Sequence, residues 1–237
     1  MTEKLPGLVY LVPLPIGENS LIQYRTEFAD QEIKKIKYWI AENARTLRRY
    51  ISSLKLGIVI DELEIFEHNH RGKEVELLRD LNSIPVSEPI GVVSEAGLPC
   101  IADPGHRVVL WAHRNDRTIF PLVGPNAVIT ALQCSGLSGQ KFIFHGYSPV
   151  KEGEWKAWIQ TLQNGLWRSY AHSFIETPYR TDKTFSTLLR LLPQEASLTL
   201  ALDLHGPQHY IKSMSVRNWK TQKKTWGKVP VTWVIGF

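Results

Sequence analysis

Two side chains that could accept a proton stand at the ends of strand-like runs in this sequence. Glu42 lies at the end of the run 36–43, and His70 ends the run 63–70. A carboxylate or imidazole placed against a substrate hydroxyl accelerates its reaction by about 10²–10⁴-fold, so Glu42 and His70 are the candidate catalytic residues. The alternatives are a carboxylate beside Arg45 at a helix start and an exposed histidine at a strand end.

A crowded loop follows another apolar run. Residues 94–105 read SEAGLPCIADPG directly after Gly91-Val92-Val93, and they include two acidic residues, two glycines and two prolines. Proline fixes its own φ and glycine permits positive φ, so this segment is either a rigid turn or the rim of a binding site. Ligands of open α/β sheets bind beyond the carboxyl ends of the strands. Because other predicted strands of this half also end in polar, glycine or proline residues, we expect a rim.

Familiar ligand motifs are absent from the sequence. It contains no G-x-G-x-x-G after the first apolar run, no G-x-x-x-x-G-K-[ST], no G-x-S-x-G and no H-E-x-x-H. A ligand held by backbone and a few carboxylates fits a cationic, adenosine-bearing molecule such as S-adenosylmethionine. His68 and His70 could share a metal ion, but no third ligand is evident, and we expect no metal.

The apolar pattern predicts the elements that must position these residues. In the first half, strands are expected at 8–15, 36–43, 63–70, 89–96 and 118–124, and helices at 44–54, 72–82 and 105–116. This alternation is typical of a parallel sheet with helices on both faces.

The second half has a different order. Strands are expected at 141–149, 168–178, 197–207, 208–216 and 229–237, and helices at 153–164 and 180–192. The last three strands follow one another with turns alone, so part of this sheet should be antiparallel. The fold class expected is α/β, with two α/β domains, 1–122 and 123–237, the first with a mainly parallel sheet, the second with a mixed sheet, and a ligand cleft between them.

Composition adds weaker constraints. The 237 residues carry 28 Lys+Arg against 23 Asp+Glu, a net charge of +5, which slightly favours an anionic partner such as RNA. The two cysteines suit a reducing cytoplasm rather than a disulfide framework, and no signal peptide is evident. Residues 118–140 carry no charge, but prolines and glycines interrupt them, so no membrane span is expected.

Seven motifs occur in order along the chain: VPLPIG, AENAR, SEAGLPCIADPG, VGPNAVITAL, FHGYSP, FIETPYR and ALDLHG. The series resembles the tetrapyrrole-methylase superfamily of S-adenosylmethionine-dependent methyltransferases. It is most similar to the bacterial branch that methylates a ribose 2′-hydroxyl of small-subunit ribosomal RNA. The resemblance implies two α/β domains with the cofactor between them, usually in a homodimer.

The resemblance also implies roles for particular residues. On the cofactor it places Leu14, Ser94, Glu95, Leu98, Asn126, Ala127, Ile175, Leu202 and Val231. For Ile175, Leu202 and Val231, the alternative is an ordinary place in the core of a sheet. Asn43, Arg45 and Arg180 are the candidate substrate-binding residues, the two arginines for a phosphate of the acceptor.

RNA binding also needs a basic surface. Stacking planes could come from Trp219 and Trp226, which are interleaved with basic residues. Those basic residues are Lys212, Arg217, Lys220, Lys223, Lys224 and Lys228.

One departure from the branch bears on activity. Asn43 and Ala44 stand where it usually has an acid and a hydroxyl residue. Two alternatives to ribosomal RNA methylation therefore stay open: methylation of a tetrapyrrole or other small molecule, and a degenerate relative that binds cofactor or RNA without transferring methyl.

Overall fold

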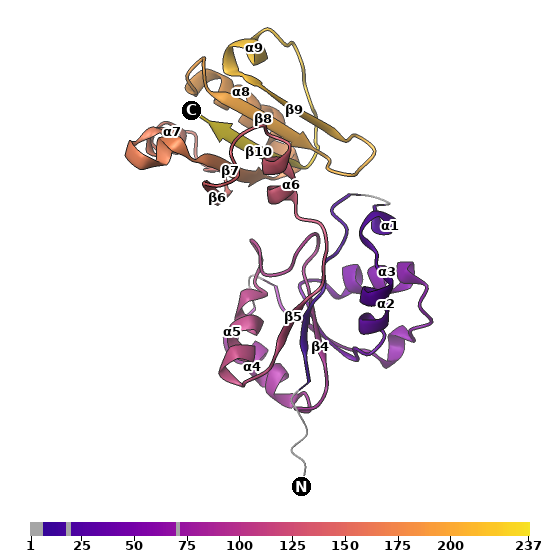
Figure 1. The fold of residues 1–237 in the computed structure, drawn as a ribbon. Helices are drawn as coiled ribbons and strands as arrows, with labels where there is room; N and C mark the ends of the chain where they lie inside the picture. The colour runs from indigo at the N-terminus through magenta and orange to yellow at the C-terminus, as the bar shows by residue number, and fades with distance from the viewer. Residues whose placement is uncertain (1–6, 18–19, 70–71) are drawn as a thin grey trace. The chain divides into compact units, whose positions relative to one another are not determined.

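The computed structural model describes residues 7–17, 20–69 and 72–237, and the chain forms two compact units, Met1–Pro125 and Asn126–Phe237 (Figure 1). The first unit is built on a five-stranded sheet of order β3-β2-β4-β1-β5, in which every neighbouring pair is parallel. The strands are β1 Val9–Leu11, β2 Tyr38–Ala41, β3 Glu64–Glu67, β4 Ile90–Val93 and β5 Ile119–Pro121.

Helices cover both faces of this sheet. Figure 1 shows α2 and α3 on one side and α4 and α5 on the other. The helical segments are α1 Leu21–Tyr24, α2 Glu27–Ile33, α3 Ala44–Leu54, the 3-10 turn η1 Ile60–Glu62, α4 Glu74–Ser83 and α5 His106–Arg114. Each face has its own apolar cluster, with Trp39 in one and Ile90 in the other. A Cβ on Gly91 would lie 2.5 Å from the Trp39 ring, so glycine at that position lets the indole pack across β4.

The second unit is built on a mixed sheet of order β6-β7-β10-β8-β9. Only the β6–β7 pair is parallel; β7–β10, β10–β8 and β8–β9 are antiparallel. The strands are β6 Phe142–Tyr147, β7 Ala171–Glu176, β8 Ser197–Leu202, β9 Tyr210–Ser215 and β10 Val231–Gly236. The helical segments are α6 Ala127–Gln133, α7 Glu154–Gln163, η2 Gly165–Ser169, η3 Pro178–Arg180, α8 Thr181–Leu191 and α9 Val216–Lys220.

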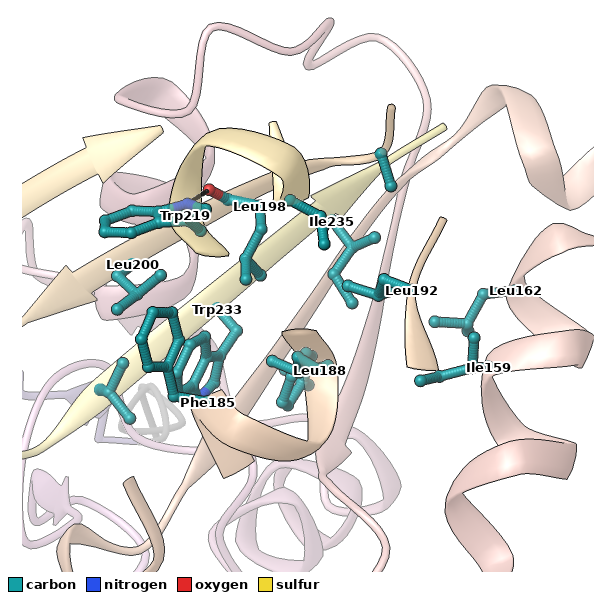
Figure 2. Packing of buried hydrophobic residues seen from close by; sticks show 14 of the residues in the cluster. Ile159, Leu162, Phe185, Leu188, Leu192, Leu198, Leu200, Trp219, Trp233 and Ile235 are labelled. Carbon is teal, nitrogen blue, oxygen red and sulfur yellow. Dashed lines mark hydrogen bonds between the residues drawn. The ribbon is translucent and has the colours of Figure 1, made fainter. Parts of the chain in front are cut away.

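The core of the second unit is rich in aromatic residues. Trp233 stacks on Phe174 and Phe185, with ring centroids 6.0 and 6.2 Å apart. The buried Trp219 donates its indole N–H to the Leu198 carbonyl at 2.7 Å (Figure 2). Residues of α7, α8 and α9 belong to the same cluster. One face of the sheet is therefore sealed by helices and rings.

The α/β fold class with one parallel and one mixed sheet is confirmed. The expectation of turns alone between the last three strands was wrong, because α9 lies between β9 and β10. The Ser215 hydroxyl caps this short helix by accepting the N–H of Asn218 at 3.2 Å, and Trp219 anchors it in the core. Among the described residues, no helix is long and apolar enough to span a membrane.

Candidate functional site

The strand ends of the first sheet bring the predicted polar residues to one edge. Since all five strands are parallel, their carboxyl ends lie on the same side of the sheet. Glu42 follows β2, His68 follows β3 and Ser94 follows β4. Val12 and Leu122 follow β1 and β5 and are buried. The edge therefore combines an apolar base with polar side chains from three adjacent strands.

The start of α3 is closed by side chains from two strand ends. The Asn43 side-chain oxygen accepts two N–H groups of the first helical turn, at 2.9 and 3.3 Å, and the Glu67 carboxylate accepts a third, from Ala44, at 2.8 Å. The Asn43 amide donates to Glu95 at 3.2 Å. Because these donors are satisfied within the protein, Asn43 is first of all a helix cap. The exposed side chains left for a ligand here are those of Glu95 and Arg45.

The loop 94–105 is held in a conformation that few residues adopt. Gly97, Cys100 and Ala102 have positive φ of 72°, 71° and 64°, which for the two non-glycine residues costs on the order of 1–3 kcal/mol each. The Asp103 carboxylate accepts the N–H groups of Cys100 and Gly105 at 2.9 and 2.8 Å. Burial, with the nearby Asp103 charge, raises the pKa of the Cys100 thiol to about 12, so this cysteine stays protonated at neutral pH.

The same loop is tied to the end of β1. Leu14 and Gly97 exchange two backbone hydrogen bonds, at 3.0 and 2.9 Å. The Leu14 side chain is buried, and the buried Ser94 hydroxyl donates to the carbonyl of its own loop at 3.1 Å. Leu98 is half-buried and Glu95 is exposed. Of the predicted cofactor residues in this unit, Glu95 and Leu98 are thus the ones whose side chains are not buried.

A pocket opens where the ends of β2, β3 and β4 meet the starts of α4 and α5. Its lining includes Glu42, His68 and Arg107. His68 Nε2 lies 2.9 Å from the Asp80 carboxylate, an arrangement that fixes the orientation of an imidazole. His70, the other predicted catalytic residue, lies outside the described residues. Among those described, no group of three or more His, Cys, Asp or Glu side chains could hold a metal ion.

The His68–Asp80 pair was missed from the sequence. The two residues are 12 positions apart, on a strand end and on the helix that follows it. In a parallel sheet such a helix runs back along its strand. The predicted strand and helix could therefore have indicated that His68 and Asp80 lie close together.

Arg180 is not free for a phosphate. Its guanidinium lies 3.3 Å from the Glu176 carboxylate, whose side chain is fully buried, and it also donates to the carbonyl of Pro149. Glu176 accepts further hydrogen bonds from Ser148 and Thr184. The geometry makes Arg180 part of an internal polar network at the end of β7.

Two members of the predicted basic surface also have partners within the protein, Trp219 in the core and Arg217 in an exposed ion pair. Trp219 is fully buried and cannot offer a stacking plane, and Arg217 is paired with Glu195. The prediction was wrong for Trp219 because its position on α9 faces the apolar core. Trp226 is half-buried, and all five lysines of the set are exposed: Lys212, Lys220, Lys223, Lys224 and Lys228.

Two curated relatives from different bacteria carry the same name. The chain is 34% identical over 188 residues to "Ribosomal RNA small subunit methyltransferase I" of Streptococcus pyogenes serotype M3, covering 79% of this chain and 61% of that protein. It is 30% identical over 198 residues to the protein of the same name from Synechocystis sp., covering 84% and 67%. The chain belongs to the ribosomal RNA small subunit methyltransferase I family.

Solved structures give the fold of this family. The methyltransferase CobJ superposes with a TM-score of 0.61 over 97% of this chain and 94% of its own, at 16% identity. The uroporphyrin-III-C-methyltransferase of Thermus thermophilus gives 0.56, also at 16% identity. No family model matches the chain. The curated relatives confirm the expected resemblance to ribosomal RNA methyltransferases, and the solved structures confirm the expected fold. The chain spans less than two thirds of the length of the streptococcal relatives.

The second-unit residues that the family resemblance assigns to the cofactor lie in different settings. In the sheet Val231 is paired with Leu202, and both are buried in the apolar cluster. Ile175 is paired with Thr232, the next residue along β10, so its side chain points to the opposite face. The Asn126 side chain caps α6 by accepting the Ile129 N–H at 2.9 Å. For Leu202 and Val231, a contact with a ligand would therefore have to come from the backbone.

Proposed function

We propose that the protein is an S-adenosylmethionine-dependent methyltransferase that methylates a ribose 2′-hydroxyl of small-subunit ribosomal RNA. The observation that carries this proposal is the similarity to curated ribosomal RNA methyltransferases over 79–84% of the chain. The preshaped loop 94–105 at the strand ends supports it. We also propose that the protein is a cytoplasmic homodimer, like the branch that it resembles.

Two side chains of this loop that are not buried fit the cofactor. Glu95 is exposed, and its carboxylate receives one hydrogen bond, from Asn43, within the described part of the chain. Its other acceptor sites are open to ribose hydroxyls or to the positive groups of the cofactor. Leu98 adds an apolar contact, while Leu14 and Ser94 hold the loop in shape. Asn126, Ala127, Ile175, Leu202 and Val231 complete the proposed binding set.

In the proposed methyl transfer, the cofactor and the protein have different tasks. S-adenosylmethionine supplies a methyl group on a positively charged sulfur, with a neutral thioether as the leaving group. The protein's main task is to hold the acceptor hydroxyl in line with that methyl group, and positioning of this kind can contribute roughly 7–11 kcal/mol.

Glu42 is our first candidate for the residue that receives the hydroxyl proton, because it lines the pocket at the strand ends. His70 is the second candidate. Asn43 and the exposed Arg45 beside it are proposed to contact the RNA.

Calorimetric titration with S-adenosylhomocysteine tests the cofactor site. We expect micromolar binding, weakened about tenfold or more in Glu95→Ala, because a hydrogen bond to a charged group contributes about 1.5–3 kcal/mol. Glu64→Ala is the matched control: it removes an exposed carboxylate from β3, away from the loop, and should bind as the wild type does. No heat with folded protein would contradict the enzyme proposal.

The acceptor is tested with a labelled methyl group. Small-subunit ribosomal RNA should become labelled, and the label should appear in an alkali-stable dinucleotide, because a methylated 2′-hydroxyl cannot assist cleavage of its phosphodiester. Label in a tetrapyrrole but not in RNA would support the small-molecule alternative. Cofactor binding without any transfer, restored by Asn43→Asp with Ala44→Thr, would support a degenerate relative.

A further inference from the structure

The segment that precedes β10 is fixed against the start of α8. The Asp182 carboxylate accepts the backbone N–H groups of Trp226 and Gly227 at 2.7 and 3.1 Å. The Thr181 hydroxyl donates to the Val229 carbonyl at 2.8 Å. The Asp182 carboxylate is thus occupied by backbone donors. These hydrogen bonds fix the backbone that carries the side chains of this segment.

Lysines and aromatic rings alternate along this segment. The Lys224 ammonium lies 5.0 Å from the ring centre of Tyr210 and 5.6 Å from that of Trp226. The Lys228 ammonium lies 5.1 Å from the ring centre of Tyr179. These distances are those of cation–π contacts, which keep each positive charge beside a ring.

Tyr179 and the lysines of this group are open to solvent, whereas Tyr210 and Trp226 are half-buried against the core. Tyr179 is 78% exposed, and Lys212, two positions from Tyr210 on β9, is exposed and shares a face of the sheet with it. In the part of the chain that the structure describes, no ion pair is formed by Lys212, Lys224 or Lys228. We name the surface the Tyr179 surface; it consists of Tyr179, Tyr210, Lys212, Lys224, Trp226 and Lys228.

We propose that the Tyr179 surface binds single-stranded RNA, with lysines on phosphates and an unstacked base on the Tyr179 ring. This inference rests on the proposed function, since it names where the RNA substrate is held. Alternating cations and rings suit a single strand, whose bases are free to stack on protein side chains. In a duplex the bases are already stacked on each other, and only the phosphates would be recognised.

Fluorescence anisotropy tests the proposal with a labelled 12-nucleotide single-stranded RNA and the corresponding duplex, over a series of KCl concentrations. Tyr179→Ala should weaken binding of the single strand about 5- to 150-fold, because stacking of one base contributes about 1–3 kcal/mol, and should leave the salt dependence unchanged. The double variant Lys224→Gln/Lys228→Gln should flatten the slope of log K against log salt by about 1.4, or about 0.7 for each phosphate contact.

Two control variants distinguish binding at the Tyr179 surface from a nonspecific effect of positive charge. Tyr179→Phe should bind as the wild type does, because the ring is retained. Lys37→Gln removes a lysine that lies 5.6 Å from the ring centre of Tyr38 in the first unit, and it should change neither affinity nor slope. Equal binding of duplex and single strand, or an unaffected Tyr179→Ala, would overturn the proposal.

Titration with S-adenosylhomocysteine shows whether a negative result contradicts the RNA surface or the proposed methyltransferase function. The Tyr179 and lysine variants should bind it as the wild type does. Loss of RNA binding in Tyr179→Ala, in a protein that never binds S-adenosylhomocysteine, would support the surface and contradict the methyltransferase. Normal cofactor binding and RNA methylation in all variants would contradict the surface alone.

Discussion

The helix-covered face of the second sheet and the strand ends of the first are built in opposite ways. The former is held by dense packing: Trp219 and Trp233 are fully buried among aromatic and aliphatic side chains. The latter is held by single polar contacts, such as those of Asn43 and Asp103 with backbone N–H groups. The first region makes a stable scaffold, and the second gives a loop its shape at the edge where ligands bind.

The difference predicts where the protein tolerates change. A densely packed core transmits any loss of volume directly to stability. A loop held by a few hydrogen bonds can lose one of them at modest cost to folding, but its shape, and with it the function, changes. Core variants should therefore lose mainly folding stability, whereas variants at the strand ends should lose mainly ligand binding.

The largest expected effect is in the core. Trp219→Ala removes a fully buried indole and should lower the free energy of unfolding by about 3–5 kcal/mol. Trp219→Phe keeps most of the ring but loses the hydrogen bond to Leu198, and this variant should cost less. Urea denaturation followed by circular dichroism measures both. Similar losses in the two variants would mean that the hydrogen bond, not the volume, dominates.

The two predicted substrate arginines should behave differently. Arg180→Ala removes the partner of the buried Glu176 carboxylate and should lower the free energy of unfolding by about 2 kcal/mol. Arg45→Ala removes an exposed side chain and should change stability by less than about 0.5 kcal/mol, while weakening RNA binding. Urea denaturation and RNA anisotropy on both variants provide the comparison, and a stable Arg180→Ala protein with weak RNA binding would reverse our assignment.

A smaller effect is expected at the cap of α3. Asn43→Ala removes the acceptor of two N–H groups in the first helical turn and should cost about 1 kcal/mol of stability. It also frees Glu95 from its hydrogen bond, so cofactor affinity should change as well. Asn43→Ser is the matched control, since serine caps helices as well as asparagine does and adds no charge beside Glu95; thermal unfolding should show it close to the wild type.

The sequence predicted most of the fold because the strands and the longer helices each have a clear period. The helix expected at 44–54 is α3, Ala44–Leu54, since an asparagine cap precedes it and its apolar residues recur at helical spacing. All ten strands in the described part of the chain were anticipated. The short helices α1, α2 and α9 were not predicted, because four, seven and five residues are too few to show a clear period.

The candidate site was less predictable for a physical reason. A strand end indicates which edge a residue occupies, but not which partner its side chain will meet. Arg180 and Trp219 have the residue types of an RNA surface, yet one meets a buried carboxylate and the other the core. The left-handed Cys100 and Ala102 have no local signal, since neither residue type favours positive φ.

One titratable pair lies within the second unit's scaffold and offers a test of the comparison. His145 Nε2 lies 2.9 Å from His172 Nδ1, and His172 Nε2 lies 2.9 Å from the Trp167 carbonyl. A carbonyl only accepts, so His172 carries its proton on Nε2. Its Nδ1 must then accept from His145. This arrangement requires His172 to be neutral and His145 to carry a proton on Nε2.

Acid should therefore loosen the scaffold before it affects the strand-end cap. Burial, with the neighbouring His172, lowers the pKa of His145 to about 4, and burial lowers the pKa of His172. The unfolded chain then binds more protons than the folded one below about pH 6.5, so stability is full at neutral pH and falls towards pH 4. Between pH 6.5 and 5, where carboxylates still carry charge, the melting temperature should fall gradually. This fall should be smaller than the losses expected for the variants described above. His145→Gln should flatten it, whereas Asn43→Ala should shift the melting temperature without changing its slope against pH. An unchanged slope in His145→Gln would show that the pair is not the acid-sensitive part of the scaffold.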